Sequence, residues 1–155
     1  MPLYYSGIPS FMATAYRHGA LDANGQAPER TISDGGIPCR HCLQNVAEGD
    51  ACLLLAYRPF PGAQPYAEVG PIFIHADECP SYSDHLRFPE RERQGDGRIL
   101  RGYGSNDRIV YGTGIVVSHD DIEAEATALL GRQDVAYVHM RSATNNCFTL
   151  RIDKA

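Results

Sequence analysis

The sequence predicts an α+β fold with a largely antiparallel sheet of about five to seven strands and two or three helices. Short apolar runs of strand length alternate with segments rich in turn-forming residues along most of the chain. Residues 135–152 have the pattern of a closing hairpin, and residues 122–130 have the apolar period of a helix. The length of 155 residues fits a single domain that spans residues 1–155.

The composition argues against nucleic acid and membranes as partners of this protein. The formal net charge of −5 argues against a protein that binds phosphate backbones, so nucleic acid is not an expected partner. No apolar run approaches the length that spans a bilayer, and no export signal is evident, so we expect a cytoplasmic protein and no membrane partner. Five cysteines, an odd number, favour reduced thiols over a disulfide framework.

The N-terminal third alternates short elements with polar loops. Residues 3–8 predict a strand that Pro9 ends, and Ser10 caps a short helix that stops near Gly19. Residues 22–36 predict a loop with an extended piece at 30–33. Pro38 suits the first turn of a helix, which we expect to run to Gly49 and to carry two cysteines at its start.

The middle of the chain predicts two strands and a long excursion. Residues 51–58 are apolar on both faces, as in a central strand. Residues 66–75 predict the next strand. Because Pro71 cannot donate a backbone hydrogen bond, we expect this strand to lie at an edge, to contain a bulge, or to begin only at Ile72. Residues 77–97 predict a long loop, and we expect its charged run at 90–93 to be a solvated face.

The C-terminal part predicts a hairpin, a helix and a second hairpin. Residues 98–103 and 108–117 predict two strands, the second with a face left bare by Gly112 and Gly114. Ser118 caps the helix predicted at 122–130. Strands at 135–141 and 147–152 then close the chain.

Two short loops carry a potential metal site. Cys39 and Cys42 have the CxxC spacing that lets two thiolates reach one ion, and His75 and Cys79 supply an HxxxC pair after a strand. Together they make a Cys3His set suited to a closed, tetrahedral zinc site. The leading hypothesis is therefore a structural zinc ion held by these four residues. Cysteines that bind no metal stay open as the alternative.

The cysteines also allow two catalytic interpretations. Cys39 at a helix N-terminus beside Arg40 and His41 would have a stabilised thiolate, although the strand that precedes a thioredoxin-like site is missing. In the last hairpin, Cys147 would stand opposite Arg141 with His139 one step away, an arrangement that could activate a nucleophile. The alternative is that His139 and Arg141 only form cross-strand and surface hydrogen bonds.

The rival to a structural protein is a small-molecule binder or an enzyme. Its groove would run over Gly112 and Gly114, where the missing side chains permit close approach of a ligand. Arg58 and Glu68 flank a Pro-rich turn and are expected to pair with each other. The remaining polar residues assigned to this groove are Tyr66, His139, Arg141 and Cys147. Whether the protein is an enzyme stays open at this point.

Four stretches carry a family resemblance. They are Pro-Cys-Arg-His-Cys-Leu at 38–43, Tyr-Arg-Pro-Phe at 57–60, Pro-Tyr-Ala-Glu-Val-Gly-Pro-Ile-Phe at 65–73 and Tyr-Gly-Thr-Gly at 111–114. In these stretches the chain resembles the bacterial domain-of-unknown-function family 1203. The resemblance implies a single-domain protein of about this length. It transfers no catalytic or binding role to any residue, because the family has no assigned activity.

Overall fold

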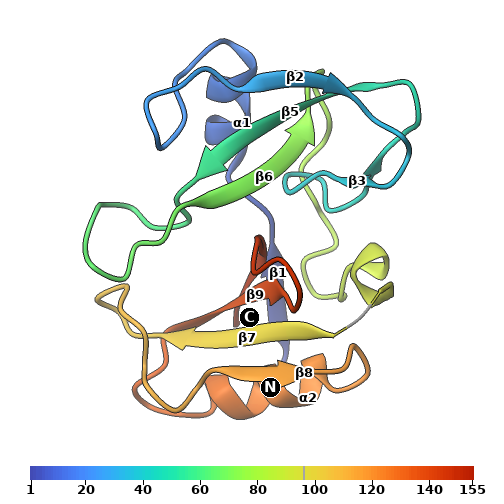
Figure 1. The fold of residues 1–155 in the computed structure, drawn as a ribbon. Helices are drawn as coiled ribbons and strands as arrows, with labels where there is room; N and C mark the ends of the chain where they lie inside the picture. Colours follow the sequence, from blue (N-terminus) through green and yellow to red (C-terminus); the bar gives the residue numbers. More distant parts are fainter. Residues whose placement is uncertain (96) are drawn as a thin grey trace.

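The computed structural model describes residues 1–95 and 97–155 and places two β-sheets one above the other (Figure 1). The larger sheet has five strands in the order β1-β10-β9-β7-β8, and all its pairings are antiparallel. This architecture confirms the predicted α+β class. The five strands are β1 (Leu3–Ser6), β7 (Arg98–Tyr103), β8 (Ile115–Val117), β9 (Tyr137–Ser142) and β10 (Phe148–Lys154).

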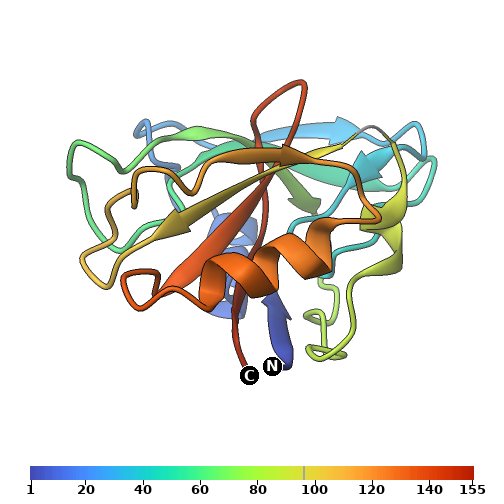
Figure 2. The same ribbon diagram turned by 90° about the horizontal axis from the view of Figure 1, so that it is seen from below.

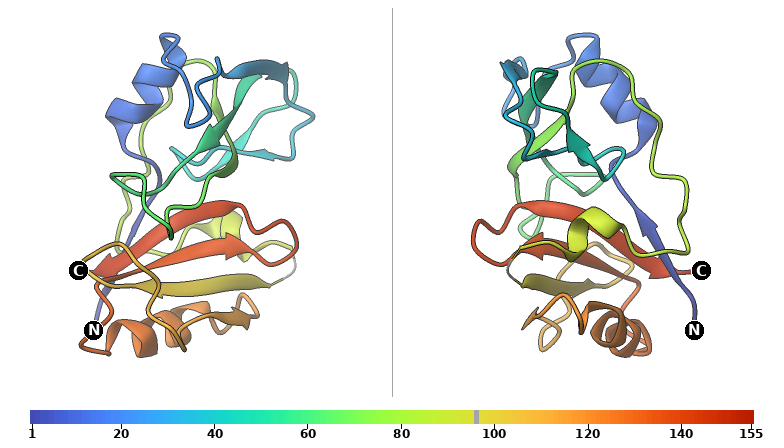
Figure 3. Two further views of the ribbon diagram at one scale, coloured as in Figure 1. Left: turned by 60° about the vertical axis from the view of Figure 1, so that its left-hand side comes forward. Right: turned by 90° about the vertical axis from the view of Figure 1, so that its right-hand side faces the viewer.

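One helix covers the outer face of this sheet. Helix α2 (Ile122–Leu130) buries an apolar stripe that recurs every four residues, and this spacing places the three side chains on one face. Figures 2 and 3 show α2 lying along the sheet on the side away from the second sheet. The core beneath it includes Leu100, Ile122, Ala126, Leu130, Val138, Met140, Leu150 and Ile152. None of the helices formed by the described residues is long and apolar enough to cross a membrane.

The smaller sheet has three strands in the order β2-β5-β6. They are β2 (Glu29–Ile32), β5 (Ala51–Tyr57) and β6 (Gly70–His75), and β5 is the central strand that its apolar sequence predicts. β6 lies at the edge, which is where a strand tolerates Pro71. Helix α1 (Ser10–Arg17) packs beside this sheet through Ala13 and Tyr16.

Aromatic side chains fill part of the space between the two sheets. Because side chains alternate across a strand, His139 and Tyr137 point to the face of β9 opposite the α2 core. His139 packs against the rings of Phe60 and Phe148, and Phe148 in turn packs against Tyr57 of β5. The inner face of the larger sheet is therefore joined to the smaller one by ring contacts.

The predicted helix at 38–49 is wrong. The chain forms β3 (Ile37–Pro38) and β4 (Asn45–Val46), a two-stranded hairpin with a tight turn between them. The backbone N–H of Cys39 donates to the Gln44 carbonyl at 2.8 Å, and Leu43 adopts a φ of 59°, which no helix permits. A turn closed in this way directs the two cysteines inward.

Two further expectations are corrected. The strand predicted at 108–117 is reduced to β8, because Gly112 has a φ of 85° and the chain at 110–114 leaves the extended conformation. The charged run at 90–93 is a single 3-10 turn, η1 (Glu90–Arg93), and it is not a solvated face throughout. Its Glu92 is only 1% exposed because three arginines surround it.

Candidate metal centre

Four potential ligands come from two loops. Cys39 and Cys42 lie in the β3–β4 turn, His75 ends β6, and Cys79 follows in the loop after it. The backbone N–H of Arg40 donates to the Phe73 carbonyl at 2.9 Å, which fixes the turn beside β6. As a result the four ligand atoms all lie within 4.8 Å of one another, close enough to bind a metal ion.

Two of the distances among these atoms match a tetrahedral metal site. Cys39 Sγ lies 3.9 Å from Cys79 Sγ, and Cys42 Sγ lies 3.6 Å from His75 Nδ1. A tetrahedron with zinc–sulfur bonds of about 2.3 Å and a zinc–nitrogen bond of about 2.0 Å has sulfur–sulfur edges of about 3.8 Å and sulfur–nitrogen edges of about 3.5 Å. A disulfide would instead need sulfurs about 2.05 Å apart, and all five cysteines are free thiols.

Several N–H donors point at the sulfur atoms. The His75 backbone N–H lies 3.3 Å from Cys39 Sγ, and Arg17 Nη2 donates to Cys79 Sγ at 3.1 Å. Arg17 Nε also donates to the His75 carbonyl at 2.9 Å, so one guanidinium bridges both members of the second pair. Donors of this kind stabilise thiolate charge and orient the ligands.

A second imidazole supports the cluster from outside. His41 Nδ1 lies 3.2 Å from Cys79 Sγ, and its Nε2 lies 2.9 Å from Ser10 Oγ. Burial and the neighbouring Arg17 lower the pKa of His41, so its ring is neutral near pH 7. A neutral ring that donates from Nδ1 to Cys79 accepts at Nε2 from the Ser10 hydroxyl.

The three thiols share protons unequally. Hydrogen bonds from the thiols of Cys42 and Cys79 hold the pKa of Cys39 well below its usual range. The same sharing raises the pKa of Cys42 and that of Cys79, because each keeps its proton while Cys39 carries the charge. Cys39 is therefore the thiolate that is formed first in this cluster.

The cluster is closed toward the core and reachable from the surface. Cys39 is fully buried, whereas His75 and Cys79 are partly exposed. A cavity of about 400 Å³ is lined by Cys42, His75, Cys79 and the chain at 80–84. An ion could reach the ligands from this side.

The structure removes the helix on which the redox interpretation relied. Cys39 follows a strand and begins a turn, so no helix N-terminus stabilises its thiolate. The two remaining cysteines are not part of the ligand set: Cys52 of β5 pairs across the strands with His75 and its thiol donates to the Thr31 carbonyl, and Cys147 lies in the β9–β10 turn. Phe148, rather than Cys147, pairs with Arg141, so the predicted nucleophile arrangement is not formed.

The predicted groove over Gly112 and Gly114 is not formed either. A side chain at Gly102 would meet Thr113, so the chain at 110–114 lies against the same face of β7 as the α2 core. His139 and Arg141 point to the opposite face, because alternation along β9 separates them from Val138 and Met140. The glycines and these two polar residues are thus on opposite sides of one sheet.

The other polar residues of that hypothesis find separate partners. Glu68 binds Arg101 and lies 3.6 Å from Arg141 Nη1, so it does not form the expected pair with Arg58. Arg58 has a buried Nε without a partner among the described residues. The hydroxyl of Tyr66 lies 2.9 Å from the exposed Tyr111 hydroxyl.

The sequence reasoning missed Arg17, Ser10 and Glu92. Arg17 ends α1 and lies 62 positions before Cys79, and no spacing rule connects the two. His41 was named from the sequence as a neighbour of Cys39, and in the structure its Nδ1 lies beside Cys79 Sγ instead. Glu92 was hidden in an alternating charge run whose exposure a sequence does not reveal.

Comparison with known proteins identifies a family. A family model described as "Protein of unknown function (DUF1203)" matches residues 36–154, which include all four residues of the cluster. Neither the curated proteins nor the solved structures gave a match.

Proposed function

Because the chain belongs to the DUF1203 family, whose description assigns no activity, we propose a function from the site itself: Cys39, Cys42, His75 and Cys79 hold a structural zinc ion. The observation that supports this most directly is the mutual distance of at most 4.8 Å among four ligand atoms from two separate loops. Three thiolates and one imidazole are a ligand set that suits zinc.

A structural role fits better than a catalytic one. Four protein ligands complete a tetrahedron and leave no position for water or substrate, whereas a catalytic zinc keeps one position open. The ion would join the β3–β4 turn, the end of β6 and the loop that follows. Arg17 extends the connection to α1, since its guanidinium binds both Cys79 Sγ and the His75 carbonyl.

The charges around the cluster also favour a bound divalent ion. Three thiolates and a neutral imidazole with Zn²⁺ have a net charge of −1, and the Arg17 guanidinium at 3.1 Å from Cys79 offsets it. Without an ion, two protonated thiols and one imidazole crowd around one thiolate. Metal binding replaces these shared protons with four coordinate bonds.

Metal analysis of the freshly purified full chain tests this function. We expect about one equivalent of zinc, and after cobalt exchange we expect the thiolate charge-transfer bands and strong d–d absorption of a tetrahedral site. Cys42→Ser should lower bound metal below about a tenth of an equivalent. Cys147→Ser is the matched control, because it removes a thiol outside the cluster, and it should keep the full metal content.

Two results would count against a structural zinc ion. One is a wild-type protein, prepared with zinc and reductant present, that carries no transition metal. The other is a cobalt spectrum of five- or six-coordinate geometry, because additional ligands would mean an open site.

A further inference from the structure

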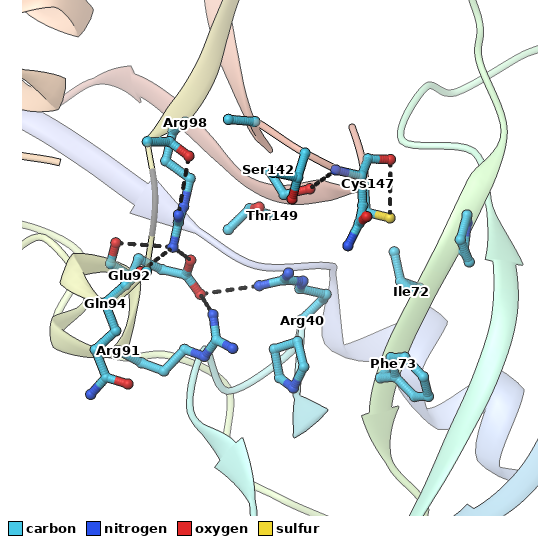
Figure 4. Close-up of a pocket in the computed structure, with 17 residues that line it drawn as sticks. Arg40, Ile72, Phe73, Arg91, Glu92, Gln94, Arg98, Ser142, Cys147 and Thr149 are labelled. Atoms are coloured by element: carbon cyan, nitrogen blue, oxygen red, sulfur yellow. Dashed lines mark hydrogen bonds and ion pairs between the residues drawn. The ribbon is translucent and has the colours of Figure 1, made fainter. Parts of the chain in front are cut away.

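A second cavity lies at the junction of the two sheets. It has a volume of about 370 Å³, within the range of about 300–1,000 Å³ of small-molecule sites. Its walls come from β3, β6, η1 and the β9–β10 turn, so segments distant in sequence enclose it (Figure 4). It shares no residue with the metal cluster.

One wall of this cavity carries positive charge. Arg40 Nη1 and Arg91 Nη1 both bind the same oxygen of Glu92, Oε1, at 3.0 and 3.2 Å. In the part of the chain that the structure describes, these two arginines make no ion pair with any other acidic residue. The second Glu92 oxygen, Oε2, is bound by Arg98 Nη2 at 3.1 Å. Arg40 and Arg91 alone therefore bring two positive charges to one carboxylate, which can neutralise only one of them.

The excess positive charge is buried and is therefore poorly screened by solvent. The Arg40 side chain is only 8% exposed and that of Arg91 is 22% exposed, so water and salt screen them weakly. An arginine taken out of water is unfavourable unless an anion and hydrogen-bond acceptors compensate it. Figure 4 shows Arg40 with Glu92 on one side and Ile72 and Phe73 of β6 on the other.

A buried hydroxyl on the same wall has no partner. Thr149 lines the cavity and is fully buried, and its Oγ1 has no hydrogen-bond partner among the described residues. Buried polar groups in proteins are nearly always hydrogen-bonded, so an unsatisfied one next to a cavity points to a missing ligand. The opposite wall is apolar, with Ile72 and Phe73 of β6.

We propose that this cavity binds a small organic anion. Its oxyanion group, a carboxylate or a phosphate, pairs with Arg40 and Arg91, and its apolar part packs against Ile72 and Phe73. Guanidinium groups suit both oxyanions, because their N–H donors match two oxygens at once. Glu92 holds the arginines in position and leaves part of their charge for the ligand.

Calorimetric titration of the full chain at constant ionic strength tests the ligand class. The probes are inorganic phosphate, phenyl phosphate, benzoate and benzamide. We expect one or both aromatic anions to bind, and the stronger of the two identifies the oxyanion. Phenyl phosphate should bind at least several-fold more tightly than phosphate if the apolar wall contributes. Benzamide, which has the shape of benzoate without its charge, should not bind.

Variants of η1 locate the binding. Arg91→Gln should weaken binding of the better probe by about tenfold or more, because a charge-assisted hydrogen bond is lost. Arg93→Gln is the matched control: it removes the same charge from the same turn, but Arg93 binds Glu90 and Glu123 away from the cavity. It should leave the affinity unchanged. Arg40→Lys keeps the positive charge but removes the paired N–H donors of the guanidinium, so it should also weaken binding.

The proposal fails if no anionic probe binds, if benzamide binds as well as benzoate, or if Arg91→Gln and Arg93→Gln have equal effects. Each of these results is independent of the metal content, which is measured on the same samples. A protein without zinc that still binds anions would thus disprove only the metal centre.

Discussion

Glu92→Gln is the substitution from which we expect the largest loss of stability outside the metal cluster. The side chain is 1% exposed and accepts from Arg40, Arg91 and Arg98 at 3.0 to 3.2 Å. Glutamine keeps the shape, but it removes the negative charge and turns an NH2 group toward at least one guanidinium. Removal of one partner from a buried ion pair destabilises a protein by about 3–5 kcal/mol.

The magnitude follows from the hydrogen bonds. If the glutamine NH2 group takes the place of Oε1, the bonds from Arg40 and Arg91 are lost, and two charge-assisted bonds of about 1.5–3 kcal/mol each amount to about 3–6 kcal/mol. This range overlaps the about 3–5 kcal/mol expected for a broken buried ion pair. For a protein of this size, each kcal/mol lowers the melting temperature by about 2–4 °C, which predicts a decrease of about 6–20 °C.

Thermal and urea unfolding followed by far-UV circular dichroism measure this effect. Glu90→Gln is the matched control, because Glu90 lies in the same turn, has an 88% exposed side chain and, among the residues that the structure describes, pairs only with Arg93, at 3.4 Å. It should change stability by less than about 0.5 kcal/mol. A loss below about 1 kcal/mol for Glu92→Gln would show that Glu92 is not the buried counter-ion that its contacts indicate.

Three further predictions follow from single contacts. Arg17→Met should lower zinc affinity by about 10–100-fold in a chelator competition, because the donor to Cys79 Sγ is lost; an affinity unchanged within twofold would refute it. Thr149→Val should raise the unfolding free energy of the anion-free protein by about 1 kcal/mol in urea, since an unsatisfied buried hydroxyl is removed; a clear decrease would mean that the hydroxyl is satisfied. Burial, and then the charges of Arg141, Arg151 and Arg101, hold the pKa of His139 well below its usual range. The unfolded chain therefore binds an extra proton below about pH 6.5, and His139 should contribute a loss of up to about 1.4 kcal/mol per pH unit as the pH falls. His139→Leu should remove that part of the pH dependence, and an unchanged slope would contradict it.

Most strands and the two α-helices were predictable because their signals are local. The run at 51–58 is continuously apolar, as in a central strand, and the stripe at 122–130 and the closing hairpin repeat with the period of the element they form. The error at 38–49 has a physical cause. Pro38 and the spacing of Cys39 and Cys42 suit a helix start, but the tight turn between β3 and β4 places both sulfurs inward, and a hydrogen bond across that turn outweighed the local preference.

Of the candidate metal centre, the four ligands were predictable and the residues that orient them were not. CxxC and HxxxC spacing marked the four residues, because each pair is close in sequence and one ion requires short separations. The orienting groups, Arg17 and Ser10, were not predictable, because they reach the cluster from α1 and no sequence pattern records that approach.

The sequence alone determined the class of fold, most of its strands and helices, and the residues able to bind a metal, since these depend on neighbours along the chain. Only the tertiary structure decided which residues meet. It separated Gly112 and Gly114 from His139 by placing them on opposite faces of a sheet, and it gathered three arginines around Glu92. The reason is that contacts between distant segments depend on strand register and face, and a shift of one residue reverses both.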